Sequence, residues 1–255
     1  MKTIVCVKWT GALGDDVEFT DDQRGVDPDY LDFALNEWDA CAIEEALRMR
    51  DAADGGEVIV VTVGGEDSEK ALVRCLAMGA DRAVRVASDD VTLVDPIRLG
   101  QLLAAAMQGE QADLVLCGAQ SSDAAQGATG SAVAAFLGFP CVAVVTKVEY
   151  DGSVGKARVH RELGGGVVEV VDVRTPAVLT IQTGINEPRY VTLRAIQQAS
   201  QAEIRVIDAE TVPLRETGYQ VRRMFVPPKA QAELIVGSSE AIAQRITKLI
   251  QEARA

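Results

Sequence analysis

Short runs of β-branched and other apolar residues alternate with longer amphipathic segments along most of the chain. The apolar runs predict buried strands at residues 3–7, 58–63, 83–86, 113–117 and 176–181, of which 176–181 is expected to be the final central strand. Apolar positions at helical spacing predict helices at residues 39–52, 68–78, 96–107 and 129–137. This alternation is typical of parallel strands joined by helical crossovers.

A different pattern begins at residue 142. Apolar and polar positions alternate with period two as far as residue 180, and the turn sequences Asp151-Gly152 and Gly164-Gly165-Gly166 interrupt them, which predicts antiparallel hairpins. After Pro188 the chain loses strand regularity, and residues 238–253 predict a terminal helix. The expected fold is a Rossmann-like (adenine-nucleotide-hydrolase-like) α/β domain over residues 1–204. It has a mostly parallel sheet with an antiparallel hairpin extension, and residues 205–255 form a C-terminal arm.

Composition narrows the function classes. The 255 residues carry a net charge of −13, which disfavours nucleic acid as a partner. No apolar run approaches the roughly 20 residues of a membrane helix, and the first residues do not resemble a signal peptide, so we expect a cytoplasmic protein without membrane insertion. The five cysteines are scattered and His160 is the single histidine, so we expect no metal site and no catalytic triad; Cys6 and Cys117 are expected to be buried.

The most informative stretch is residues 118–140, rich in Gly, Ala, Ser and Thr. It follows a predicted strand and opens a predicted helix, where free backbone amides suit a phosphate group. A plain strand-to-helix loop with Asp123 or Thr129 as the helix N-cap is the alternative. The chain has neither a Walker A loop nor a Gly-x-Gly-x-x-Gly fingerprint, so a nucleotide triphosphatase or an autonomous NAD- or FAD-binding domain is not indicated.

Two further clusters of polar residues lie where a predicted strand or helix meets a loop. In the first, at residues 36–46, Asn36 or Asp39 is expected to cap a helix. Glu44 and Glu45 follow each other directly and so do not face one another on a helix, which disfavours an acid–base pair. The second, at residues 184–190, is expected to be an Asn-initiated turn directed by Pro188.

Taken together, these three clusters resemble the β subunit of electron-transfer flavoproteins. The resemblance covers nearly the whole chain and includes residues 5–8, 77–82 and 161–166 in the same order and spacing. Residues 35–39, 120–123 and 221–224 are similar to the bacterial methylotroph type, which serves trimethylamine- or dimethylglycine-type dehydrogenases.

The resemblance implies an electron carrier subunit without substrate turnover of its own, in a heterodimer whose α subunit holds most of the FAD. It also implies a structural AMP, with the C-terminal arm packed on the α subunit. Carried over position by position, the AMP site comprises Cys6, Asn36, Val63, Asp123, Gln126, Gly127, Ala128, Thr129 and Gly130. Many members have side-chain donors where this chain has Gly127 and Ala128, so backbone amides are expected to hold more of the phosphate. Leu13 is expected near the FAD, where many members have a tyrosine.

The resemblance further implies a docking segment for the dehydrogenase, of the acyl-CoA or methylated-amine type, with a quinone oxidoreductase downstream. Leu193 is the expected anchor, accompanied by Tyr190, Arg194 and Ile196. The alternative is that Leu193 faces inward from a helix over residues 193–199. Two other functions remain open: a bifurcating-type subunit with a second FAD, and a universal-stress-type ATP-binding module.

Overall fold

A computed structural model describes residues 1–14, 17–53, 55–88, 95–215, 221–228, 232 and 234–254. The chain divides into two compact units, Met1–Met224 and Phe225–Ala255. The second unit contains the helix α6 (Ser239–Arg254). No helix in the described ranges is long and apolar enough to cross a membrane.

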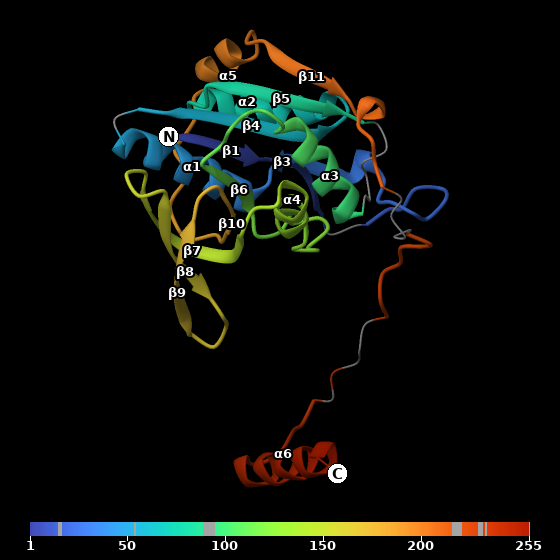
Figure 1. The fold of residues 1–255 in the computed structure, drawn as a ribbon. Coiled ribbons are helices and arrows are strands. Elements are labelled where there is room, and N and C mark those ends of the chain that lie inside the picture. Colours follow the sequence, from blue (N-terminus) through green and yellow to red (C-terminus); the bar gives the residue numbers. More distant parts are fainter. Residues whose placement is uncertain are drawn as a thin grey trace. The chain divides into compact units, whose positions relative to one another are not determined.

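The first unit is built on a sheet that has nine strands among the described residues, in the order β11-β5-β4-β1-β6-β10-β7-β8-β9 (Figure 1). All neighbours from β11 to β7 are parallel, and β8 and β9 continue the sheet in antiparallel fashion. The strands are β1 (Lys2–Cys6), β4 (Glu57–Gly64), β5 (Arg82–Ala87), β6 (Leu114–Gly118), β7 (Cys141–Asp151), β8 (Lys156–Glu162), β9 (Val168–Arg174), β10 (Ala177–Ile181) and β11 (Ile204–Asp208). The predicted Rossmann-like sheet and its hairpin extension are therefore confirmed.

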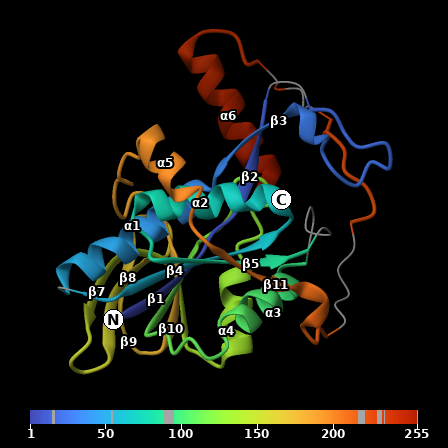
Figure 2. The same ribbon diagram turned by 90° about the horizontal axis from the view of Figure 1, so that it is seen from above.

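Helices cover both faces of the parallel part. One face packs against α1 (Glu37–Ala52), α2 (Glu69–Met78) and α5 (Leu193–Ala199), and the other against α3 (Pro96–Ala106) and α4 (Thr129–Leu137) (Figure 2). Because both faces are covered, β1, β4, β6 and β10 are buried along most of their length, which explains their continuous apolar runs. The predicted helices agree with the observed ones to within two residues at each end.

The hairpin extension begins at a distortion in β7. The register between β7 and β10 shifts after Leu179, and Val144 has a positive φ of 60°. The backbone N–H of Val144 donates to Oγ1 of the buried Thr180 at 3.0 Å, which satisfies a group that the bulge would otherwise leave unpaired. Beyond this point β7 pairs with β8 and leaves the parallel part of the sheet.

One prediction about the sheet is wrong, and one part of the fold was not predicted. Strand regularity does not end at Pro188, since β11 pairs in parallel with β5. Because β11 lies at the edge of the sheet, residues 176–181 still form the last central strand, as predicted. Only Ile204 and Ile207 of β11 are partly buried and its other three residues are exposed, so its apolar signal is weak. The sequence also gave no indication of a small antiparallel sheet, β2 (Trp9–Leu13) paired with β3 (Leu31–Leu35), whose β3 side chains are mostly exposed.

The boundary between compact units lies at Met224, later than the expected end of the α/β domain at residue 204. The division of function between residues 1–204 and 205–255 is a separate matter and stays a prediction.

Candidate functional site

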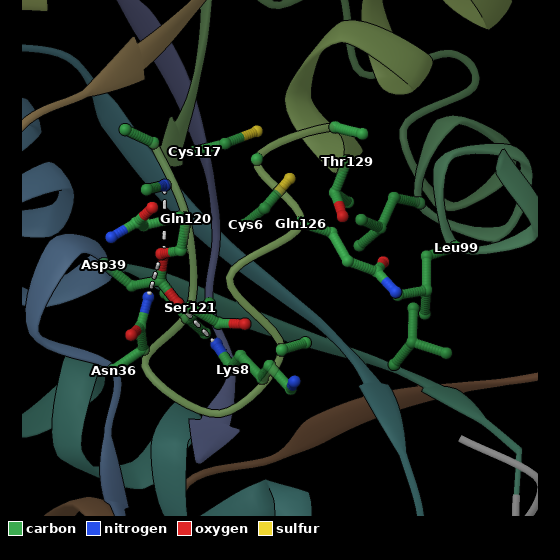
Figure 3. A pocket seen from close by; sticks show the side chains of 18 residues that line it. Cys6, Lys8, Asn36, Asp39, Leu99, Cys117, Gln120, Ser121, Gln126 and Thr129 are labelled. Atoms are coloured by element: carbon green, nitrogen blue, oxygen red, sulfur yellow. Dashed lines mark hydrogen bonds between the residues drawn. The ribbon is translucent and has the colours of Figure 1, made fainter. Parts of the chain in front are cut away.

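A pocket lies at the carboxyl ends of β1, β4 and β6. The chain runs from β1 to β4 on one side and later returns to place β6 on the other side of β1, so this is a point where the strand order reverses. Ligands of open α/β sheets bind at such points. The pocket has about 920 Å³ of empty space, part of it open to solvent (Figure 3).

A side chain in the first turn of α1 forms hydrogen bonds with the ends of both β1 and β6, beside the pocket. Asp39 Oδ2 accepts the backbone N–H of Lys8 at 2.9 Å, just after β1, and Oδ1 accepts that of Gly118 at 3.0 Å, at the end of β6. Asn36 Nδ2 donates to the carbonyl of Gln120 at 2.9 Å, and Asn36 Oδ1 accepts the N–H of Ser122 at 3.3 Å. These contacts hold the first half of the 119–128 loop against α1.

This arrangement corrects the expected capping role. Asn36 occupies the N-cap position of α1 but makes no side-chain cap bond, because its amide is used on the loop instead. Burial raises the pKa of Asp39 from the usual 3.8 to about 7, although hydrogen bonds from Asn36 and from the amides of Lys8 and Gly118 act in the opposite direction. Asp39 is thus a titratable group in the wall of the pocket.

Two glycines explain the small-residue composition of residues 118–140. A Cβ on Gly118 would lie 2.3 Å from Asp39 Oδ1 and 2.7 Å from Trp38 Cβ. A Cβ on Gly130 would lie 2.5 Å from Thr180 Cγ2. At both positions a larger residue would push the loop or α4 away from the sheet.

The loop ends at the N-terminus of α4, which faces the pocket through Ala128 and Thr129. Neither Asp123 nor Thr129 is the N-cap: Ala128 holds that position, and no side chain in the described part of the chain caps the helix. The first-turn amides therefore keep their hydrogen-bonding capacity and the positive end of the helix dipole. An anion such as phosphate suits this end of the pocket.

The remaining walls are mostly apolar. Cys6 and Cys117 are register partners on β1 and β6, and both are buried as expected. Val63 on β4 and Leu99 and Leu103 on α3 complete this part of the lining. A flat, largely apolar group such as a nucleobase fits these surroundings better than a second charged group does.

The structure brings most of the predicted AMP residues together. The pocket is lined by Cys6, Asn36, Val63, Gln126, Gly127, Ala128 and Thr129. Asp123 and Gly130 do not line it: Asp123 faces Lys8, and Gly130 packs on Thr180. The side chain of Leu13, at the end of β2, lies outside the described residues. In the described parts of the chain no group of three or more His, Cys, Asp or Glu residues could hold a metal.

Sequence reasoning did not select several lining residues, among them Lys8, Asp39, Leu99, Leu103 and Gln120. The position of Lys8, directly after a predicted strand, and of Asp39, in the first turn of a predicted helix, could have indicated both. Leu99 and Leu103 belong to α3, on a separate crossover, and no local motif distinguishes them from core leucines.

The second polar cluster holds the 186–189 segment against α1. Arg189 Nε and the Arg189 backbone N–H both donate to Glu44 Oε2, at 2.8 and 3.1 Å. Asn186 Nδ2 donates to Glu45 Oε2 at 2.9 Å. Burial acts to raise the pKa of Glu44, but hydrogen bonds from Arg189 and Arg48 outweigh it and the pKa is lowered; burial of Glu45 raises its pKa. The two glutamates thus make separate structural contacts and do not form an acid–base pair.

The segment that follows is exposed at the expected docking residues. Leu193 is 78% exposed at the start of α5, so it is not the inward-facing leucine of the alternative interpretation. Tyr190 and Arg194 are also exposed. Ile196 differs, since it is partly buried and packs against the core under α5. Thr192 fixes the start of the helix, because its side chain accepts the Ala195 N–H at 3.2 Å.

The sheet order and the pocket at the strand-order reversal define an α/β protein of the Rossmann-like class. The electron transfer flavoprotein domain model matches residues 25–212. The electron transfer flavoprotein subunit beta of Methylophilus methylotrophus is 41% identical over 99% of this chain and 98% of its own length. That of Bacillus subtilis is 32% identical over 89% of each chain, and that of Sus scrofa 31% over 98% of each. The chain belongs to the electron transfer flavoprotein β-subunit family, and its likeness to the methylotroph type is confirmed.

Proposed function

We propose that this chain is the β subunit of a heterodimeric electron-transfer flavoprotein. It accepts electrons from dehydrogenases and passes them on through an FAD that the α subunit mainly holds, without turning over a substrate itself. The observation that carries the proposal is the pocket beside β1 and β6, where the strand order reverses. The N-terminus of α4, which has no side-chain cap, lies at one end of this pocket, and the chain belongs to this family.

The nucleotide in this pocket is AMP, bound as a structural ligand. The amides at the start of α4, with Gly127 and Ala128 before them, support a phosphate group by backbone contacts. The apolar wall formed by Cys6, Val63 and Leu99 supports the adenine base. The side-chain amide of Asn36 is already engaged by the loop, which keeps the pocket in shape before the ligand binds.

The partner subunit covers apolar surface of the second unit. Leu234, Val236, Ile246 and Ile250 are large apolar side chains exposed on or before α6. A helix with such a face is stabilised when a partner buries it, and a second unit of 31 residues is too small to bury it alone. The α subunit is the proposed occupant, and Leu13 is proposed to approach its FAD.

The dehydrogenase docks on the exposed segment around Leu193. A large apolar side chain that is 78% exposed between the polar neighbours Thr192 and Arg194 has the form of an interface anchor. Tyr190 and Arg194 are proposed to surround it, whereas Ile196 supports the helix from below. Dehydrogenases of the acyl-CoA or methylated-amine type are the proposed donors, and a quinone oxidoreductase the proposed acceptor.

The test is co-expression with a candidate α subunit, chosen as a neighbouring reading frame that encodes a C-terminal FAD domain. The proposal predicts a one-to-one complex with a flavin absorbance spectrum that bleaches when a catalytic amount of a dehydrogenase and an excess of its substrate are added. A homodimer that binds ATP and no flavin would indicate the universal-stress-type alternative. Turnover of a nucleotide by the isolated chain would contradict the electron carrier assignment.

A further inference from the structure

The pocket holds an ion pair that the proposed AMP site does not explain. Lys8 is the only cationic side chain among the described residues that line the pocket. Its Nζ lies 2.7 Å from both carboxylate oxygens of Asp123, and Asp123 itself does not line the pocket. The single full positive charge at the pocket wall is therefore already matched by a carboxylate.

The charge that remains for a ligand is small. The N-terminus of α4 contributes the equivalent of about half a positive charge. A terminal phosphate brings roughly −1.5 to −2 at neutral pH, and each further phosphate adds about one more negative charge. Sites for di- and triphosphates usually provide a free lysine and a divalent cation, and no metal-holding cluster occurs in the described ranges.

The position of Asp123 affects how many phosphate groups a ligand in the pocket can carry. Its Oδ1 also accepts the N–H of Ala124 at 2.7 Å, so the carboxylate is fixed in the loop next to Ala124, which lines the pocket. A phosphate chain that extended from the α4 end toward Lys8 would approach this carboxylate. Like charges that come close together in a partly buried site repel each other.

We infer that Asp123 is a specificity-determining residue that restricts the pocket to a nucleoside monophosphate, by neutralising Lys8 and repelling a second phosphate. This inference rests on the proposed nucleotide site. It assigns Asp123 a role different from the phosphate contact that the family resemblance implied, because its carboxylate faces Lys8.

The experiment compares AMP and ADP binding to the full chain in its purified complex. The bound nucleotide is first removed from the complex. Dissociation constants for AMP and for ADP are then measured by calorimetry at low salt with a chelator present. Asp123→Asn can keep the Ala124 contact but no longer neutralises Lys8 or repels a second phosphate. The ratio of the dissociation constant for ADP to that for AMP is therefore expected to fall at least about tenfold. For Lys8→Gln, which leaves Asp123 unpaired, the same ratio is expected to rise.

Asp172→Asn is the matched control, since it removes the same charge from an exposed ion pair with Arg158 at 2.7 Å, away from the pocket lining. It should leave the ratio unchanged. If Asp123→Asn weakens or strengthens AMP and ADP equally, Asp123 acts only on the loop and the inference is wrong. If the unaltered complex binds neither nucleotide, the proposed nucleotide site itself fails, which is a distinguishable result.

Discussion

The carboxylate of Asp39 accepts the backbone N–H of Gly118 at 3.0 Å, and with its other oxygen it holds the amide of Lys8. One side chain from α1 thus joins the ends of the two strands between which the pocket opens. Because Asp39 is buried, this link depends on its protonation state as well as on its geometry.

The first prediction concerns the pH dependence that Asp39 gives to stability. Its folded-state pKa of about 7 lies above the usual 3.8, so the folded protein holds this proton more tightly than the unfolded chain. Its stabilising contribution is complete below about pH 4 and is lost as the pH rises through about 7. The free energy of unfolding of the unaltered protein minus that of Asp39→Asn should therefore fall across this window, by up to roughly 4 kcal/mol.

Denaturant titrations of both proteins at several pH values between 4 and 8 measure this difference. The subtraction removes the opposite trend of carboxylates with lowered pKa, such as Glu44 and Glu110. A difference that does not change with pH would show that Asp39 does not titrate in this range.

The second prediction tests the close approach at Gly118. Gly118→Ala places a methyl group 2.3 Å from Asp39 Oδ1, which forces the loop or α1 to shift and should cost about 3 kcal/mol of stability. The pocket should lose nucleotide in the same variant. Gly14→Ala is the control, since no described residue lies within 4 Å of its added Cβ, and its effect should stay within about 0.5 kcal/mol. Equal melting temperatures for the two variants would rule out a tight contact at Gly118.

The third prediction concerns the Glu44–Arg189 pair. Arg189→Gln leaves the Glu44 carboxylate, only 4% exposed, with fewer donors and should destabilise the protein by about 1–3 kcal/mol. It should also increase proteolytic cleavage around residues 186–190. Arg158→Gln, at an exposed pair with Asp172, should cost less than about 1 kcal/mol. If both variants unfold at the same denaturant concentration, the buried carboxylate does not depend on Arg189.

The fourth prediction concerns docking. Leu193→Ala removes an exposed anchor and should lower the affinity for the dehydrogenase roughly 30- to 1000-fold, without altering cofactor content or thermal stability. Electron transfer rates at low protein concentration measure this. Val154→Ala, which truncates a 61% exposed valine in the β7–β8 turn, should leave the rate unchanged. Loss of cofactor in Leu193→Ala, or an unaltered transfer rate, would contradict the docking role.

The buried parallel strands and their helices could be predicted because continuous apolar runs and helical spacing are local signals. β11 and β3 could not, since their mostly exposed side chains give little apolar periodicity. In the site, the small residues near Gly118 and Thr129 indicated a phosphate loop, but the roles of Asn36 and Asp39 depend on contacts with residues more than 80 and 70 positions away, respectively. The pairing of Lys8 with Asp123 is also long-range, and no local motif indicates it.

The central claim is that the pocket holds AMP in a heterodimer with one FAD. Its most direct test is mass spectrometry and chromatographic quantification of the nucleotides released when the purified complex is denatured. The account predicts one FAD and one AMP per complex, with AMP absent after Gly118→Ala. Two FAD and no AMP per complex would contradict it and indicate the bifurcating type.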